Sequence, residues 1–401
     1  ILDTAIDDLK TGESLDGQVI FKLHDTYGFP LELTEEITRE RGISIDSEGF
    51  SEAMNQQIER AKAARKENGT ADISGDLRPL LEEHGSTSFI GREENKTEAE
   101  VLYIENNYVV LDRTPFYAES GGQIGDTGTF TATKGTVRVT DTRLALDGLH
   151  VHEIEDNELE IAVGDKLVVE IDTARRTNIR RNHTATHLLH ASLRQVLGEH
   201  VKQQGSWVGP DRLRFDFSHY AAVQSEEIKD IEDMVNKEVL NNSLCNHYET
   251  SKEEAEAAGA IAFFGDKYGD QVRVLEAGPN SIELCGGTHV NALGDIGAFK
   301  IITEGSVGAN IRRIEAITGP APINRLRDLE STLALASEKL GVPIDDVLEG
   351  IDKRIAENKE IKNELNEVRR ALALNQVDAL ADAAENGLVI TEVTGVDQEG
   401  L

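Results

Sequence analysis

Cysteine, methionine and tryptophan are scarce in this chain: its 401 residues include two cysteines, two methionines and one tryptophan. Two cysteines are too few for the disulfide scaffold of a small secreted protein, so a reducing compartment is favoured. No apolar run approaches the about 20 residues that cross a bilayer as a helix. The first residues lack the basic and apolar regions of a signal peptide. These absences predict a cytoplasmic protein with no membrane partner.

Basic residues are outnumbered by acidic ones, 41 against 74, which gives a net charge of −33. This charge favours solubility and disfavours general affinity for polyanions. Any nucleic-acid surface must therefore be local. The basic clusters that could form one are 175–182, which includes Arg180 and Arg181, and the pair Arg312 and Arg313. For both clusters the alternative interpretation is a solvated basic face.

The chain is too long for one ordinary core and should divide into two to four domains. Residues 1–80 are predicted to be helical, because apolar positions at 31–37 and 50–54 recur every three to four residues. Over 86–172 the pattern changes to short alternating runs with Gly and Asp turns between them. That pattern predicts a small β-barrel or a β-sandwich.

Helices and strands are mixed over 173–319, where the patterns predict helices at 183–197 and 225–241 and several strands. After residue 320, apolar positions at helical spacing predict a helical hairpin or coiled coil over 320–385. Residues 386–401 look like the start of a further unit, and Ile1 in place of Met suggests a piece of a longer protein. The predicted fold class is α+β with several domains.

Two pairs of side chains carry the strongest chemical signal. His183 and His187 lie four residues apart on the predicted helix, so both imidazoles share one face. His190 lies on that face too, and spacing does not decide which two of the three bind a metal. Cys285 and His289 are also four residues apart, after a strand-like segment, with two glycines that would allow a tight turn.

Together these pairs supply three imidazoles and one thiolate, a ligand set that suits tetrahedral Zn²⁺. Four protein ligands saturate a tetrahedral zinc, which favours a structural role, whereas a catalytic zinc usually keeps one position open. Catalysis is still possible if the metal takes a fifth ligand or if polar groups position a water molecule. Thr186 and Gln203 are the candidate catalytic groups. The alternatives are a threonine bonded to the preceding helical turn and an exposed glutamine.

Several segments are similar to bacterial alanyl-tRNA synthetases. The editing domain of that family resembles HTATH at 183–187, LLH at 188–190, RQVLG at 194–198, CGGTH at 285–289 and the segment 305–319 with Arg312 and Arg313. The segment FKLHDTYGFP at 21–30 resembles the end of the family's tRNA-recognition helices. The segment TPFYAESGGQIGD at 114–126 resembles its β-barrel.

The resemblance implies an editing hydrolase that deacylates Ser-tRNA(Ala) and Gly-tRNA(Ala). The resemblance implies that the Zn²⁺ ligands are His183, His187, Cys285 and His289, and that Thr186 and Gln203 line the pocket. It also implies tRNA(Ala) as a partner and dimerisation through the C-terminal helices. The aminoacylation domain, with its ATP and Mg²⁺, is expected before Ile1, because no Gly-rich phosphate loop follows a strand in this chain.

Two other functions fit the same residues. One is a non-catalytic, zinc-stabilised module for tRNA binding and dimerisation, which the saturated ligand set favours. The other is a free-standing alanyl-tRNA editing protein, which would share the zinc motifs. The helices expected before residue 80 disfavour this second possibility.

Overall fold

The computed structural model describes residues 6, 14–27, 34, 37–39, 41–47, 49–50, 52–54, 77–146, 148–155, 161–261 and 269–382. The chain divides into two units, Ile1–Ile323 and Asn324–Leu401, and each is considered by itself. Much of the helical segment predicted for 1–80 and the whole of 386–401 lie outside the described residues. Among the described residues, no helix combines the length and apolar character that crossing a membrane requires.

The N-terminal segment contains helix α2, Gly17–Tyr27. Its buried face contributes Ile20 to a small apolar cluster with Leu15 and Phe50. Asp46 joins the two parts of this segment, because its carboxylate accepts hydrogen bonds from the backbone N–H groups of Gly17 and Gly49. The described part of 1–80 is thus helical only in part, because residues 14–16 and 41–46 form turns and a short parallel bridge between Leu15 and Ile45.

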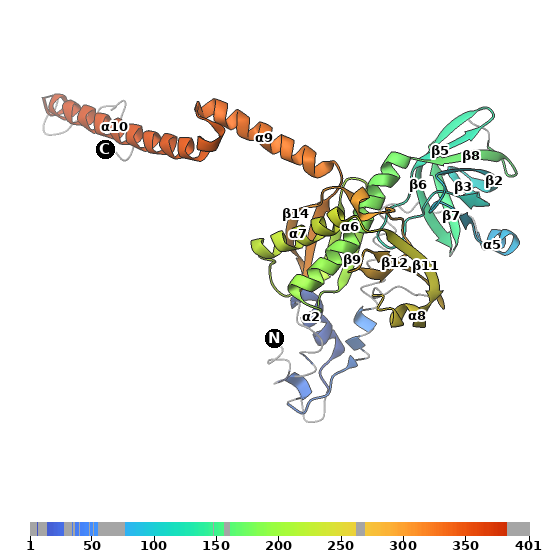
Figure 1. Ribbon diagram of the computed structural model, residues 1–401. Coiled ribbons are helices and arrows are strands. Elements are labelled where there is room, and N and C mark those ends of the chain that lie inside the picture. The colour runs from blue at the N-terminus through green and yellow to red at the C-terminus, as the bar shows by residue number, and fades with distance from the viewer. Residues whose placement is uncertain are drawn as a thin grey trace. The chain divides into compact units, whose positions relative to one another are not determined.

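Six strands close into a barrel in the order β2-β3-β7-β6-β5-β8 (Figure 1). Their bounds are β2 Lys96–Glu105, β3 Tyr108–Leu111, β5 Gly128–Ala132, β6 Gly135–Leu146, β7 Leu149–Ile154 and β8 Lys166–Ile171. The alternating positions that predicted strands point apolar side chains inward, where Val101, Phe130 and Val169 are fully buried. The closed order decides for the barrel over the sandwich.

One end of the barrel is covered by helix α5, Arg78–His84. Leu80 and Leu81 of this helix pack on Val110 and Leu149 of the barrel strands. The next strand in sequence, β1 at Ser88–Phe89, pairs in parallel with β4 at Arg113–Thr114, which follows β3. Helix α5 therefore packs on the barrel, although it precedes residue 86, where the β-rich segment was predicted to begin.

The region after the barrel is built from helices packed on two sheets. Its elements are α6 Thr173–Leu197, β9 Gln203–Val208, β10 Leu213–Ser218, α7 Ser225–Asn241, β11 Cys245–Ser251, α8 Lys252–Ala257, β12 Gln271–Ala277, β13 Ile282–Leu284, η1 Leu293–Ile296, β14 Lys300–Gly308 and β15 Ile311–Ile317. One sheet has the order β14-β15-β10-β9 and the other β11-β12-β13. Apolar residues of α6, α7 and both sheets share one core.

Helix α6 begins at Thr173 rather than at the predicted residue 183. Asp172 caps its first turn, since the carboxylate accepts a hydrogen bond of 2.9 Å from the backbone N–H of Arg175. The extra turns contain few apolar residues, so apolar periodicity did not indicate them. Gly198, with φ of 117°, ends the helix at the predicted place.

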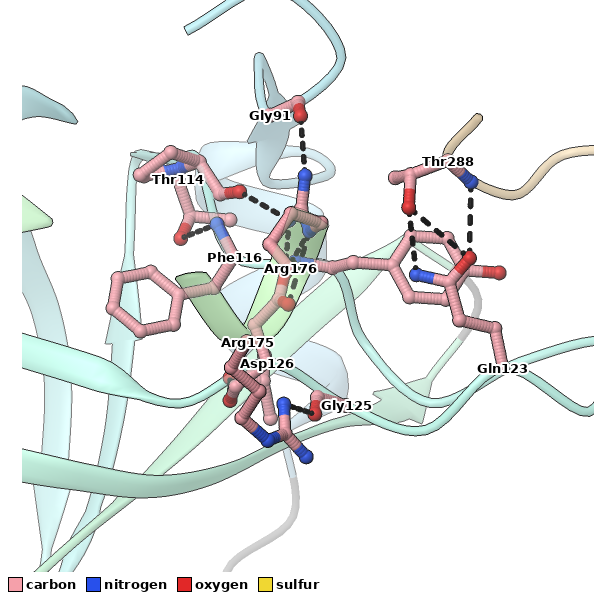
Figure 2. A network of polar contacts seen from close by, with 12 residues as sticks. Gly91, Thr114, Phe116, Gln123, Gly125, Asp126, Arg175, Arg176 and Thr288 are labelled. Carbon is pink, nitrogen blue, oxygen red and sulfur yellow. Dashed lines mark hydrogen bonds and ion pairs between the residues drawn. The ribbon is translucent and has the colours of Figure 1, made fainter. Parts of the chain in front are cut away.

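An ion pair between Arg176 and Asp126 joins α6 to the barrel (Figure 2). Arg176 is fully buried, and it also donates to the backbone oxygens of Gly91 at 2.6 Å and Pro115 at 3.0 Å. Asp126 accepts a further hydrogen bond of 2.7 Å from the backbone N–H of Tyr117. Arg176 is buried in the protein, so for this residue neither of the two interpretations of the basic cluster, nucleic-acid binding or a solvated face, is correct.

The second unit is helical, with α9 Ala321–Leu340, the short turn η2 Ile344–Asp346 and α10 Val347–Asp382. Gly341, with φ of 72°, follows the end of α9, where the sequence predicted a bend. Val347 at the start of α10 is buried, but most large apolar side chains along the two helices are at least 40% exposed, among them Leu326, Leu329, Leu333, Leu335, Ile351, Ile355, Ile361, Leu365, Val368 and Leu372. These two helices therefore do not bury each other's apolar stripes as a hairpin would, and a coiled coil with a second chain stays a prediction.

Candidate metal centre

Four side chains from two distant segments converge on one point. The ligand atoms of His183, His187, Cys285 and His289 all lie within 4.8 Å of one another. Cys285 Sγ is 3.4 Å from His183 Nε2 and 3.2 Å from His289 Nε2. A tetrahedral zinc with bonds of about 2.0–2.3 Å has ligand separations of about 3.3–3.8 Å. The donor set and its spacing therefore fit a tetrahedral zinc ion, and the assignment of each residue as a ligand stays a prediction.

The two segments reach this point for simple geometric reasons. Helix α6 presents His183 and His187 on one face, with their rings stacked 5.2 Å apart. Cys285 directly follows β13, and Arg273 of the neighbouring strand holds the loop by donating to the backbone oxygens of Cys285 and Gly287, each at 3.0 Å. These hydrogen bonds hold the loop beside the helix face that carries the two histidines.

Gly287 is required for close approach rather than for a turn. A Cβ at this position would lie 2.1 Å from Cε1 of His183, whereas a Cβ at Gly286 would meet nothing within 4 Å. Neither glycine has a positive φ. The sequence analysis expected both glycines to serve a tight turn, and the structure corrects that reason.

Each imidazole has an oxygen acceptor at its Nδ1 atom. His183 Nδ1 donates to Oε1 of Gln123 at 2.8 Å, and His289 Nδ1 donates to Oγ1 of Thr184 at 3.2 Å. His187 Nδ1 donates to the carboxylate of Glu283. A proton on Nδ1 leaves the Nε2 lone pair for a metal, and such partners orient ligating histidines and raise their basicity.

Gln123 comes from the barrel and is fully buried. Its Oε1 atom also accepts a hydrogen bond of 3.0 Å from the backbone N–H of Thr288, and its Nε2 donates to Thr288 Oγ1 at 3.0 Å, as Figure 2 shows. Backbone hydrogen bonds of the flanking Gly122 and Ile124 with Val208 attach the same loop to β9. The barrel therefore completes the site, and no spacing or motif in the sequence indicated this role for Gln123.

Glu283 is the second residue that the sequence analysis missed. It is 1% exposed and also accepts a hydrogen bond of 2.7 Å from His190 Nδ1. Burial alone would raise the pKa of this carboxyl, but His187 and His190 lower it to about 2. His190 thus contacts the carboxylate and is not among the four converging residues. The signal in the sequence that could have identified Glu283 is an acidic residue in a strand-like segment two positions before Cys285.

Electrostatics put two of the four side chains in the form that a metal needs. Burial alone would raise the pKa of the Cys285 thiol, but His183, His289 and His187 lower it well below its ordinary value. Burial lowers the pKa of His289 to about 3, so that imidazole is neutral. His187 differs: burial opposes its charge, but Glu283 and Cys285 raise its pKa to about 10. A proton on His187 therefore competes with a metal.

The two candidate catalytic groups lie on α6 and β9. Thr186 is buried, and its hydroxyl donates to the backbone oxygen of Asn182 at 2.9 Å, which is the bond to the preceding turn expected under the alternative interpretation. Its oxygen still has lone pairs that can accept. Gln203 is the first residue of β9, is half-buried and pairs with Phe217. Roles for both in a pocket stay predictions.

The arginines predicted to bind tRNA make contacts within the chain. Arg312 binds both carboxylate oxygens of Glu304, at 2.6 and 2.7 Å, and Arg313 binds both of Asp216 at the same distances. Arg181 donates to the backbone oxygen of Asp295 at 2.9 Å. These contacts fix the guanidinium groups, and their role in RNA binding stays a prediction.

Arg180 lies beside the buried Arg176 at the start of α6. It donates to the backbone oxygens of Gly91 and Arg92, each at 3.3 Å. Burial and then the charge of Arg176 lower its pKa. Arg180 thus continues the contact between α6 and the barrel, and its proposed contact with tRNA stays a prediction.

Two family matches cover different parts of the chain. Residues 1–175 match the class II (A) tRNA synthetases, and residues 272–315 match the second additional domain of threonyl and alanyl tRNA synthetases. The second match includes Glu283, Cys285 and His289. The chain is therefore similar to class II synthetases outside the segment that resembles an editing domain as well as within it.

The similar curated proteins are alanine–tRNA ligases. Those of Rhizobium meliloti (strain 1021) and Magnetococcus marinus are each 41% identical to this chain, over 430 and 418 residues, and that of Rhizobium johnstonii is 40% identical over 429 residues. Each alignment covers 100% of this chain and 48% of the relative, so the chain spans about half the length of the curated relatives it matches. Over its whole length the chain is similar to part of these alanine–tRNA ligases, and residues 272–315 match the second additional domain of threonyl and alanyl tRNA synthetases.

Proposed function

We propose that this chain belongs to an alanine–tRNA ligase and hydrolyses Ser-tRNA(Ala) and Gly-tRNA(Ala) at a zinc site. Its partners would be tRNA(Ala) and, through the C-terminal helices, a second copy of the chain. Attachment of alanine with ATP and Mg²⁺ would be the activity of the whole ligase. The match of residues 1–175 to class II synthetases favours part of such an enzyme over a free-standing editing protein.

The observation that carries this proposal is the convergence of His183, His187, Cys285 and His289 within 4.8 Å, with each imidazole Nδ1 held by an oxygen acceptor. Bound Zn²⁺ would supply Lewis-acid chemistry for ester hydrolysis. The chain's own residues would orient the substrate.

Thr186 would recognise the serine hydroxyl. Its own proton is committed to the backbone oxygen of Asn182, so it would act as an acceptor. Gln203 would donate from its amide to a substrate carbonyl or hold a water molecule. A second site is needed because a pocket that accepts alanine rejects a side chain with one added hydroxyl only weakly.

The test is release of serine from Ser-tRNA(Ala) by the zinc-loaded protein, compared with Cys285→Ala. The wild-type protein should deacylate faster, because the variant lacks the thiolate ligand. Cys245→Ala is the matched control, since Cys245 is buried away from the four residues. Equal rates for the wild type and Cys285→Ala would refute the hydrolase proposal.

The second candidate function is a zinc-stabilised module that binds tRNA without hydrolysing it. The saturated set of four ligands is the observation that favours it. The same variant separates the two functions. Loss of thermal stability in Cys285→Ala, together with no serine release by the wild type, would support the binding module.

A further inference from the structure

The only tryptophan of the chain lies between two arginines on the hairpin of β9 and β10. The guanidinium carbon of Arg214 is 5.0 Å from the centre of the Trp207 ring, and that of Arg212 is 5.6 Å from it. Trp207 and Arg214 are also direct cross-strand partners. Contacts of this kind between a guanidinium and an indole are favourable and hold both planar groups in place.

The hairpin turn is shaped to hold the ring. A Cβ at Gly209 would lie 2.3 Å from Cη2 of Trp207, so the indole lies across a position that only glycine permits. The backbone N–H of Gly209 donates to the carbonyl oxygen of Arg212 at 3.1 Å and closes the turn. Trp207, Gly209, Arg212 and Arg214 therefore form one fixed unit, which we call the arginine–tryptophan hairpin.

Of these two arginines, Arg212 has a carboxylate partner, and Arg214 lacks the ion pair that neighbouring arginines have. Arg313, on the next strand but on the same sheet, binds Asp216 through two hydrogen bonds. Within the described residues, Arg214 takes part in no ion pair, and its buried Nε atom has no hydrogen-bond partner. Arg212 is 46% exposed, and its Nε atom forms a long ion pair of 3.7 Å with Glu315, which is the cross-strand partner of Arg214. Although the chain has 74 acidic residues, the Arg214 guanidinium has no ion pair among the described residues, which leaves it available to an external anion.

The arginine–tryptophan hairpin adjoins the metal centre. Asn182, the residue before His183, donates from its side chain to the backbone oxygen of Gly209 at 2.8 Å. On the other side, Val208 pairs with the barrel loop that contains Gln123. An anion on the hairpin would therefore lie next to the elements that position the predicted zinc ligands.

We propose that Arg212 and Arg214, held on Trp207, bind phosphate groups of the RNA whose aminoacyl end enters the metal centre. The identity of the RNA rests on the function proposed above. Guanidinium groups bind phosphate through paired hydrogen bonds, and phosphate contacts set the register of a nucleic acid on a protein. These residues position the substrate and take no part in the chemistry.

The first test uses the fluorescence of Trp207, which reports on this site alone because no other tryptophan is present. Titration of the full chain with tRNA(Ala) should change the emission at tRNA concentrations near the dissociation constant, and inorganic phosphate at the same concentration should not. An unchanged emission on saturation with tRNA, or an equal response to phosphate alone, would overturn the proposal of an RNA contact.

The second test removes the charges. Arg214→Gln and Arg212→Gln should each weaken tRNA binding several-fold and reduce the slope of log affinity against log salt by about one. Arg138→Gln is the matched control, because Arg138 is 65% exposed on the barrel and contacts Glu155. Unchanged affinity and slope in both hairpin variants, with melting temperatures equal to the wild type, would exclude the contact.

A small substrate separates this inference from the proposed function. Both hairpin variants should hydrolyse a serine ester of adenosine, which carries no phosphate, at the wild-type rate, while their rates on Ser-tRNA(Ala) below saturation should fall with the affinity. If the wild type hydrolyses neither substrate, the proposed function fails, and the binding and fluorescence measurements still decide the role of the hairpin.

Discussion

Gly287 shows how a single residue controls the predicted metal site. Its Cα hydrogen faces His183 where a Cβ would lie 2.1 Å from the ring, while Gly286 next to it faces open space. The constraint comes from packing between two segments that are far apart in sequence. The two adjacent glycines are therefore unequal, which the motif by itself does not reveal.

The first prediction compares these two glycines. Gly287→Ala should displace His183 and lower zinc affinity by at least about tenfold, a loss typical of disturbed metal-ligand orientation. Gly286→Ala should bind zinc as the wild type does. Zinc affinity measured by competition with a chromophoric chelator checks both variants, and equal affinities would show that the loop moves freely to accept a Cβ.

Gln123 and Glu283 extend the same lesson to the residues behind the predicted ligands. Both are buried polar side chains that accept hydrogen bonds from histidine Nδ1 atoms. His183 and His187 were identifiable from helical spacing, because one helix face brings them together. Nothing in the spacing of Gln123 relates it to His183, 60 residues away. Only the contact between barrel and helix creates that relation.

At the scale of elements, α6 serves both the barrel and the metal centre. Its first turns carry Arg176 into the barrel contact, and the turns that follow carry His183 and His187. The ion pair of Arg176 with Asp126 is buried on both sides, at 0% and 1% exposure. Removing one partner of such a buried ion pair destabilises the fold strongly, because the remaining charge stays buried without a partner or water to solvate it.

The second prediction concerns this contact. Arg176→Met should lower the free energy of unfolding by about 3–5 kcal/mol, because Asp126 would remain buried without its partner. Arg175→Met should cost about 1 kcal/mol or less, since Arg175 is only half-buried and loses one hydrogen bond to Gly125. Urea unfolding followed by circular dichroism measures both. Similar losses for the two variants would contradict the assignment of Arg176 as the central contact.

The sequence indicated some elements better than others. Helix α7 runs over Ser225–Asn241 as its apolar spacing predicted, because one face packs on the core and the other is charged. Strands β11 and β15 were not predicted. Strand β15 contains Arg312 and Arg313, which mask its alternation, and they are accommodated there by carboxylates from β14 and β10. Strand β15 is therefore stabilised by ion pairs with its neighbouring strands, which a pattern of alternating apolar residues does not indicate.

At the scale of the whole molecule, the barrel makes stability depend on pH through His152. This side chain is fully buried and lies between Phe116 and Phe130, with ring centres 5.3 and 5.2 Å away. Its Nδ1 donates to the backbone oxygen of Val109 at 3.1 Å, and its Nε2 accepts from Thr114 at 2.8 Å. Burial lowers its pKa from 6.5 to about 3.

The third prediction follows from this shift. Between pH 6.5 and about 3 the unfolded chain protonates His152 and the folded chain does not. The unfolded state binds more protons, so stability is lost as pH falls, by up to about 1.4 kcal/mol per pH unit from this group. His152→Gln should remove that contribution. Urea unfolding at several values between pH 7 and 4.5 checks it, and parallel curves for the two proteins would rule it out.

The sequence by itself determined the α+β class, the β-rich segment, the helix face with two histidines and the similarity to alanyl-tRNA synthetases. These features depend on local periodicity and on contiguous motifs. The tertiary structure decided that the strands close into a barrel, that Gln123 and Glu283 hold the histidines, that Arg176 is buried, and that Arg214 has no carboxylate partner among the described residues. Each of these depends on segments that meet only when the chain folds, so no spacing along the sequence contains them.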